Sequence, residues 1–121
     1  MTYFDHVAYQ IVNPAAMTVG RGLHPAASPF DKRVGEALGV SAFEMYQVEL
    51  PAGAETVLHD HVEDGAEDAY AFVRGSGWVI VDGEEVPVEP GDFVAVTVES
   101  TRQVRAGQDG LVLIAVCASD N

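Results

Sequence analysis

The segment LHDHVEDGAEDAYAFVRG, residues 58–75, holds the side chains best suited to chemistry. Its two histidines, His59 and His61, are one residue apart and precede an acidic stretch. If residues 56–62 form a strand, alternation places both imidazoles on one face, with Cα atoms about 6.5–7 Å apart. Two imidazoles at that spacing can bind one ion. The same pair is equally compatible with the polar side of a half-exposed strand that binds nothing.

A carboxylate follows at the start of the next expected strand. There Asp68, Tyr70 and Phe72 share a face, so Asp68 could approach the same ion, and Glu67 could serve in its place. Two histidines and one carboxylate suit a first-row transition metal with open positions for water or substrate. We therefore predict one divalent metal, for which zinc, manganese, iron and nickel all fit. Tyr70 and Phe72 are candidate substrate contacts, although such aromatic residues more often pack in a core.

Composition narrows the class of protein. The 121 residues suffice for one domain. Six basic against 19 acidic residues give a net charge of -13, which repels nucleic acids and anionic lipid surfaces, so the expected partner is a small molecule. No apolar run approaches the roughly 20 residues of a membrane-spanning helix, and the start lacks the features of a signal peptide. A cytoplasmic protein is expected.

From residue 41 onward the sequence consists of short apolar or alternating segments separated by turn signals, which is typical of a sandwich or barrel. The expected strands lie near 42–50, 56–62, 69–74, 77–82, 93–97, 101–106 and 111–118. Asp82-Gly83 predicts a tight hairpin. The best helix candidate is the short segment 31–39, which Gly39 could end.

Residues 1–40 are expected to form an N-terminal arm, followed by the barrel at 41–118 and a tail at 119–121. One strand is expected in the arm, at residues 3–12. It could pair with an edge of its own sheet or add to the sheet of a neighbouring subunit, because an unpaired edge invites aggregation. We therefore expect a homodimer, the commonest closed symmetry.

Two stretches carry a resemblance to a known family. The spacing of glycines, histidines and acid resembles the first cupin motif: Gly53, His59, Asp60, His61, Asp68, Gly75. GEEVPVEPGDFVAV, residues 83–96, resembles the second. The resemblance covers about residues 41–118 and is closest to small single-domain bacterial cupins of the cupin 2 conserved barrel type. It implies an all-β fold, the double-stranded β-helix or jelly-roll barrel, whose interior holds metal and substrate in cupin enzymes.

The chain departs from the cupin pattern at three places. Asp68 stands where cupins usually carry glutamate, although Glu67 precedes it. The loop between His61 and Asp68 is two or three residues longer than the common form. The fourth ligand in the family is a histidine beyond the second motif, and counting along the chain reaches Arg102 instead.

Arg102 has no lone pair for a metal and brings a fixed positive charge. It could be a surface residue at the end of a strand. If it faces inward, beside Val104, it could hold Asp68 in a salt bridge or clamp an acidic ligand. Two functions follow. One is a metal-binding small-molecule cupin with isomerase, cyclase or dioxygenase-type activity. The alternative is a metal-free, non-catalytic barrel in which Arg102 anchors an acidic ligand.

Overall fold

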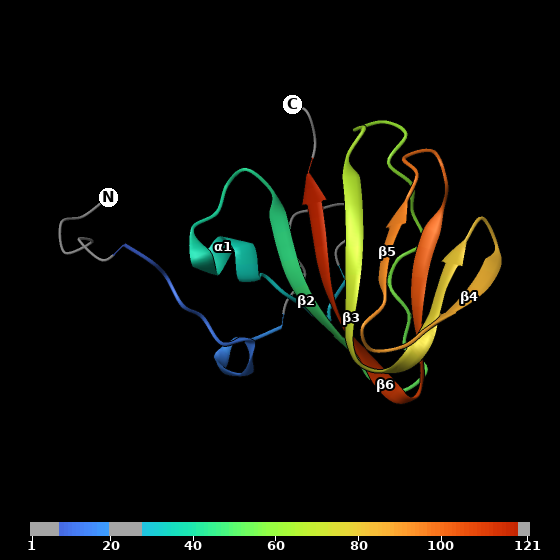
Figure 1. The fold of residues 1–121 in the computed structure, drawn as a ribbon, viewed down its shortest axis with the longest axis horizontal. Helices are drawn as coiled ribbons and strands as arrows, with labels where there is room; N and C mark the ends of the chain where they lie inside the picture. The colour runs from blue at the N-terminus through green and yellow to red at the C-terminus, as the bar shows by residue number, and fades with distance from the viewer. Residues whose placement is uncertain (1–7, 20–27, 119–121) are drawn as a thin grey trace.

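The computed structural model describes residues 8–19 and 28–118 as an all-β fold with antiparallel pairing throughout (Figure 1). The strands run in the order β1-β2-β6-β3-β4, and β5 also pairs with β3. Their bounds are β1 Asp31–Lys32, β2 Glu44–Leu50, β3 Glu67–Val81, β4 Glu84–Val88, β5 Phe93–Val96 and β6 Arg102–Ala118. The helices are the 3-10 helix η1, Pro14–Ala16, and α1, Val34–Leu38.

Two long bent strands, β3 and β6, build both halves of the barrel. The expected strand pairs 69–74 with 77–82, and 101–106 with 111–118, are each one strand, so those breaks were wrong. The glycine-rich segments bend the strands at register shifts and do not end them. A Cβ at Gly75 would lie 2.1 Å from the Gly110 carbonyl oxygen, so only glycine allows β6 to approach this closely.

The expected strand at 56–62 was also wrong. This segment runs beside β6 with only isolated bridges, Glu55 to Arg105 and His59 to Arg102. The Thr56 N–H donates to the Val104 carbonyl at 2.9 Å, and His59 N–H donates to the Arg102 carbonyl at 3.1 Å. These two hydrogen bonds lie three positions apart on this segment, at Thr56 and His59, but only two positions apart on β6, at Val104 and Arg102. The extra residue prevents a regular ladder.

Two local predictions are confirmed. A helix occupies Val34–Leu38 within the expected segment 31–39, and Gly39 ends it in the left-handed conformation. The hairpin between β3 and β4 turns at Asp82 and Gly83, whose φ angles of 49° and 84° are both positive. Positive φ at both central residues is what a type I′ turn requires.

The core consists of the side chains that point inward from these strands. Its buried members are Val48, Leu50, Tyr70, Phe72, Val79, Val88, Val104, Ala106, Leu111 and Leu113. Burying their apolar surface stabilises the barrel. Four buried residues of the strands break this apolar pattern: Asp31 and Lys32 of β1, Asp68 of β3 and Arg102 of β6. Of these, Asp68 and Arg102 place two opposite charges beside the core.

The described part of the arm does not form the expected strand. Residues 8–12 form no strand, and Tyr9 and Ile11 are 67% and 79% exposed. Residues 3–7 of the expected strand lie outside the described residues. Lys32 links the arm to the barrel, because its ammonium donates to the Pro14 carbonyl at 2.8 Å. Addition of the arm to a second copy stays a prediction.

None of the helices in the described ranges has the length and apolar character needed to cross a membrane.

Gly75 and Gly83 allow a matched test of the close approach between β3 and β6. Their φ angles are similar, 89° and 84°, but only at Gly75 would a Cβ meet neighbouring atoms within 4 Å. Gly75→Ala should therefore lower the free energy of unfolding by about 2 kcal/mol more than Gly83→Ala does. Urea unfolding of both variants measures the difference. Equal losses would show that β3 and β6 can separate locally without cost.

Candidate metal site in the barrel

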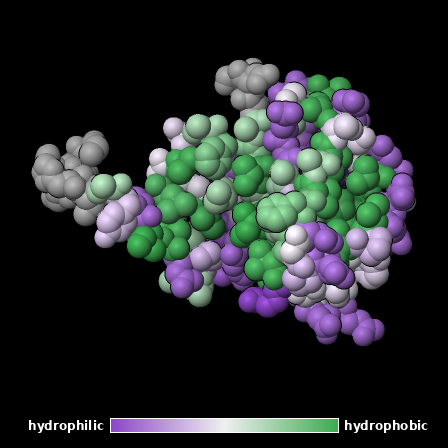
Figure 2. Space-filling model, viewed as in Figure 1, coloured by the Kyte–Doolittle hydropathy of each residue, from purple (hydrophilic) through white to green (hydrophobic). Residues whose placement is uncertain are grey.

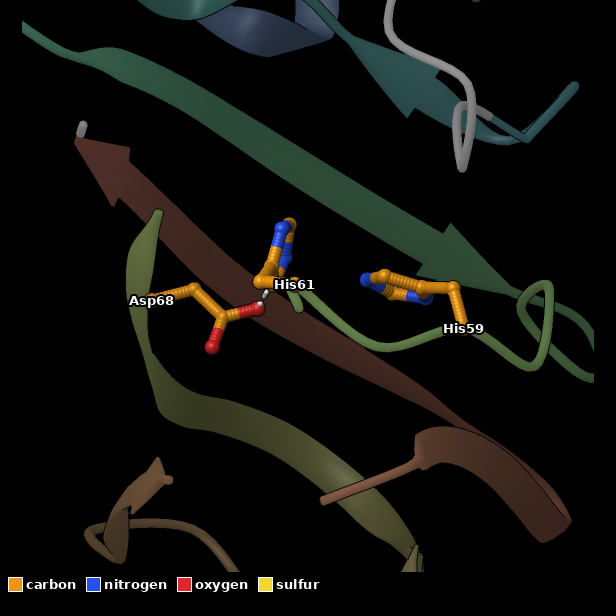
Figure 3. Close-up of side chains that lie close together, drawn as sticks. All are labelled: His59, His61 and Asp68. Atoms are coloured by element: carbon orange, nitrogen blue, oxygen red, sulfur yellow. Dashed lines mark hydrogen bonds and ion pairs between the residues drawn. The ribbon is translucent and has the colours of Figure 1, made fainter. Parts of the chain in front are cut away.

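The three predicted donors come together inside the barrel. His59 and His61 project from the segment that precedes β3, and Asp68 projects from the start of β3 (Figure 3). One ligand atom from each lies within 4.8 Å of the others. The two imidazoles meet edge to face, with ring centroids 5.0 Å apart. The pairing of His59 with Arg102 and the bond from His61 N–H to the Val98 carbonyl, at 3.1 Å, bring both rings to this point without a regular strand.

His59 has its tautomer fixed by the backbone. Its Nδ1 lies 2.8 Å from the Val57 carbonyl oxygen, which can only accept, so Nδ1 carries the proton and Nε2 the lone pair. Burial lowers the pKa of His59 below its usual value, against the opposing effect of this hydrogen bond. The charges of His61 and Arg102 lower the pKa further. The neutral imidazole is the form that binds a metal.

His61 is buried between two carboxylates. Its Nδ1 lies 3.0 Å from Asp64 Oδ1, and its Nε2 lies 3.2 Å from Asp68 Oδ2. Asp64 was not predicted as part of the site. The turn that brings it there is closed by Gly65 N–H, which donates to the His61 carbonyl at 2.9 Å. A carboxylate on the outer nitrogen of a histidine orients the ring and raises its basicity as a ligand.

Arg102 is fully buried and faces inward on the same side as Val104, as strand alternation predicts. Its Nη1 donates to Asp68 Oδ1 at 2.7 Å. Nη2 donates to the Thr97 carbonyl at 2.6 Å, and Nε donates to the Ser100 carbonyl at 3.2 Å. All three guanidinium nitrogens are therefore engaged by the protein. Of the two inward roles expected for Arg102, the structure contains the salt bridge to Asp68.

Asp68 is the centre of the network. Oδ1 accepts from Arg102, whereas Oδ2 faces His61 and accepts from the Tyr70 hydroxyl at 3.1 Å. Burial and the charge of Asp68 raise the pKa of Tyr70 above its usual value, so its hydroxyl keeps its proton. Glu67 is exposed on the other face of β3. Asp68, and not Glu67, is thus the carboxylate beside the histidines.

A cavity of about 70 Å³ opens onto this network. Its wall includes His59, His61, Asp68 and Tyr70, together with the apolar side chains Val48, Val104 and Leu113. By volume it could hold several waters or a small polar molecule. Phe72 and Arg102, which were candidate substrate contacts, do not line the cavity.

The part of the cavity wall that Tyr46 and Asp31 contribute was not predicted. Tyr46 on β2 and Tyr70 on β3 both pair with Ala115 of β6, whose small side chain leaves room between the two rings. Burial and Glu44, which accepts from the Tyr46 hydroxyl, raise the pKa of Tyr46. Asp31 also lines this wall. The positions of Tyr46, Tyr70 and Asp31 in the sequence do not indicate that these residues meet, because they lie on separate strands.

The donor set fits a divalent metal. Two imidazoles and a carboxylate are ligands that zinc, iron, manganese and nickel accept, and catalytic sites commonly use three protein ligands with an open position. The short separation of the donor atoms means that small side-chain rotations suffice to reach metal–ligand distances of about 2.0–2.2 Å. Arg102 opposes this fit, because its charge is repelled by a dication.

Comparisons with known proteins support the fold. Neither a protein-family model nor a curated protein matches the sequence. Solved structures do match. A protein from Silicibacter pomeroyi, described as a sugar phosphate isomerase from a cupin superfamily, has a TM-score of 0.75 and 21% identity over 90% of this chain and 75% of that chain.

Two further structures cover nearly the whole chain. A cupin 2 conserved barrel domain protein from Salinispora arenicola has a TM-score of 0.70 and 18% identity, over 96% of this chain and 92% of that chain. A predicted oxalate decarboxylase from Thermotoga maritima has a TM-score of 0.71 and 20% identity, over 91% and 99%. The chain therefore folds as a cupin-type jelly-roll barrel, which confirms the expectation from its motifs.

The alkylation rate of Cys117 tests how far the cavity that it lines shields its thiol. Burial, together with the charge of Asp68, raises the pKa of its thiol to about 11. Because only the thiolate reacts, alkylation should accelerate by about tenfold per pH unit from pH 8 to pH 10. Mass spectrometry after timed iodoacetamide treatment measures the rate. The same chain unfolded in urea is the control, and its rate should level off above about pH 9. A folded profile like the unfolded one would contradict the burial of this thiol.

Proposed function

We propose that the barrel interior is a small-molecule site that binds one divalent metal through His59, His61 and Asp68. The convergence of these three donors within 4.8 Å on the wall of one cavity is the observation that carries the proposal. The fixed tautomer of His59 adds to it, since the nitrogen with the lone pair is the one not used by Val57.

Each residue has a definite part in this proposal. His59 and His61 bind through Nε2, and Asp64 holds the proton on Nδ1 of His61. Asp68 binds through Oδ2 alone, because Arg102 holds its Oδ1. The hydrogen bond between His61 Nε2 and Asp68 Oδ2 must open for both atoms to serve as ligands. A bound divalent metal would supply Lewis acidity toward a substrate carbonyl or enolate.

The chemistry we propose is isomerase, cyclase or dioxygenase-type conversion of a small polar substrate. The fold neighbours from Silicibacter pomeroyi and Thermotoga maritima, described as a sugar phosphate isomerase and a predicted oxalate decarboxylase, support a small-molecule role for such a barrel. Tyr46 and Tyr70 would accept hydrogen bonds from the substrate, because the single proton of each hydroxyl is already donated to a carboxylate, that of Glu44 and that of Asp68 respectively. Asp31 provides an acceptor on the wall that carries Tyr46.

A second candidate function is favoured by the buried ion pair between Asp68 and Arg102. In this alternative the guanidinium supplies the positive charge beside the carboxylate, no metal binds, and the cavity takes a small ligand without turnover. Anchoring of an acidic ligand by Arg102 would require the ligand to displace Asp68, since the guanidinium is engaged by protein acceptors. Binding between Tyr46 and Tyr70 requires no such exchange.

Metal content should depend jointly on the two histidines. His59→Ala and His61→Ala each remove one of three ligands, so each should lose most of the bound metal while the barrel core keeps its fold. Asp60→Asn is the control, because it alters an exposed carboxylate between the histidines. Elemental analysis of protein purified without an affinity tag or added metal gives the readout. Full metal content in the double histidine variant would refute the proposed ligand set.

Arg102 distinguishes the two candidate functions. Arg102→His removes the repulsive charge and adds an imidazole, so affinity for divalent metal should rise by about tenfold or more, which corresponds to about 1.4 kcal/mol. Arg102→Ala should raise the affinity less. It should also lower the free energy of unfolding by about 3–5 kcal/mol, because Asp68 loses its buried partner.

Calorimetric titration with manganese, zinc and nickel measures the affinities. Arg105→Ala is the matched control, because Arg105 lies on the same strand but pairs at the surface with Glu55 and Glu85. Unchanged affinity in both Arg102 variants would show that its charge does not act on the metal. No binding in the wild type and no gain in Arg102→Ala would favour the metal-free candidate.

A further inference from the structure

The tyrosine side chains that line the cavity accept hydrogen bonds but have no proton left to donate. The Tyr46 hydroxyl donates its single proton to the carboxylate of Glu44. The Tyr70 hydroxyl donates its proton to Asp68 Oδ2 at 3.1 Å. Each hydroxyl oxygen keeps lone pairs that can still accept. A ligand in the cavity therefore meets acceptors at both rings.

Asp31 adds a buried carboxylate to the same cavity wall. Its exposed fraction is 7%. Oδ1 accepts from the Ser28 hydroxyl at 2.7 Å, and Oδ2 accepts from the Ser28 N–H at 2.9 Å. Both donors are neutral, so the charge of Asp31 is hydrogen-bonded but not compensated by a cation among the described residues. Burial of such a charge is costly, and a cationic ligand in the cavity would offset the cost.

The basic side chains near this wall are bound to other carboxylates. Lys32, the neighbour of Asp31 on β1, pairs with Glu49 at 3.1 Å. Arg33 pairs with Glu36, and Arg102 is held in its buried ion pair with the carboxylate at the start of β3. None of these three basic residues lines the cavity. An anionic ligand would therefore find no cation of the described chain in the cavity wall.

The electrostatic environment of the cavity is negative. Burial raises the pKa of Cys117, and the charges of Asp68, Glu44 and Asp64 raise it further, against the opposing charge of Arg102. The whole chain carries 19 acidic and six basic residues. Figure 2 shows the hydrophilic side chains, in purple, concentrated toward the rim of this face of the molecule. A field of this sign attracts small cations and repels anions.

Aromatic rings and apolar side chains complete the cavity. Tyr46 on β2 and Tyr70 on β3 both pair with Ala115 of β6, and all three line the cavity. The face of an aromatic ring attracts a cation. Val48 and Leu113 supply apolar contacts for a short alkyl group. The cavity volume is about 70 Å³. Because one water needs about 10–15 Å³ of such volume, roughly five non-hydrogen atoms fit.

We propose that the cavity takes a small primary amine in its protonated form, with the ammonium group beside Asp31 and the ring of Tyr46. An ammonium group has three N–H donors and no acceptor, which matches a wall of acceptors. The proposal rests on the barrel interior being the ligand site of the proposed function, and it names the substrate class of that site. The ammonium does not use the ligand atoms of His59, His61 or Asp68, so a metal and the amine do not compete for them.

Three probes of similar size and different charge test the proposal: propylammonium, n-propanol and propionate. Amide NMR spectra of the full chain, titrated with each probe at about pH 7, where the amine is protonated, report binding at the cavity wall. Propylammonium should bind with a dissociation constant of about 1 mM. Binding of n-propanol should be weaker by about tenfold or more, and propionate should cause no saturable shift. The same order should hold for protein as purified and for protein with a chelator.

Asp31→Asn keeps the size of the side chain and removes its charge. It should weaken the binding of propylammonium by about tenfold and leave n-propanol unchanged. Asp92→Asn is the matched control. Asp92 also accepts a backbone N–H from three residues earlier, that of Glu89 at 2.9 Å, but it does not line the cavity. Wild-type affinity for propylammonium in Asp31→Asn would overturn the assigned position of the ammonium group.

A second pair of variants tests the aromatic contact, independently of any local change at β1. Tyr46→Leu removes the ring and should weaken propylammonium by about threefold or more, with a smaller effect on n-propanol. Tyr46→Phe keeps the ring and should keep most of the affinity. Equal loss for both probes in Tyr46→Leu would show that the ring contributes shape and not attraction for a cation.

Other outcomes would overturn the substrate class. Equal affinity for propylammonium and n-propanol would do so, as would tighter binding of propionate or the absence of saturable shifts with all three probes. A preference that disappears with the chelator would show that a metal, and not Asp31, holds the amine. Metal content is measured separately. Protein that holds metal without preferring the amine would keep the proposed metal site and lose this inference, and the converse result would do the reverse.

Discussion

The buried ion pair between Asp68 and Arg102 is the interaction on which the site depends. It joins the start of β3 to the start of β6, and through the Thr97 and Ser100 carbonyls it fixes the turn that precedes β6. Two charges taken out of water are tolerable only when each is paired and hydrogen-bonded, and both conditions are met here. The orientation of Asp68 toward His61 and Tyr70 follows from the anchoring of its other oxygen.

In the same ion pair, Arg102 competes with a divalent metal for the carboxylate of Asp68. Asp68 gives one oxygen to the guanidinium, and only the other faces the histidines. Folding favours a tight ion pair, whereas metal binding favours a carboxylate whose charge is not already compensated. The ion pair therefore lowers the metal affinity of the site but holds its carboxylate in one orientation. It also discriminates against ligands that would need the guanidinium, because that group has no surface exposed.

Sequence alone predicted the jelly-roll class, the hairpin at Asp82-Gly83 and the donor set, because these depend on short-range spacing. It predicted the convergence of His59 and His61 for a wrong reason, since bridges to β6 and not a regular strand bring the rings together. The true length of β3 could not be predicted, because RGSG is as compatible with a turn as with a bulge, and only the close backbone of Gly110 decides between them. Asp64 and Tyr46 were missed because their contacts arise from folding and not from a motif.

The alternation of side chains along β3 connects the cavity to the solvent-facing side of the sheet. On β3, Asp68 and Tyr70 point inward while Ala69 and Ala71 point outward, so one segment supplies both the donor network and the apolar surface. A register slip of one residue would exchange these roles and expose the ion pair.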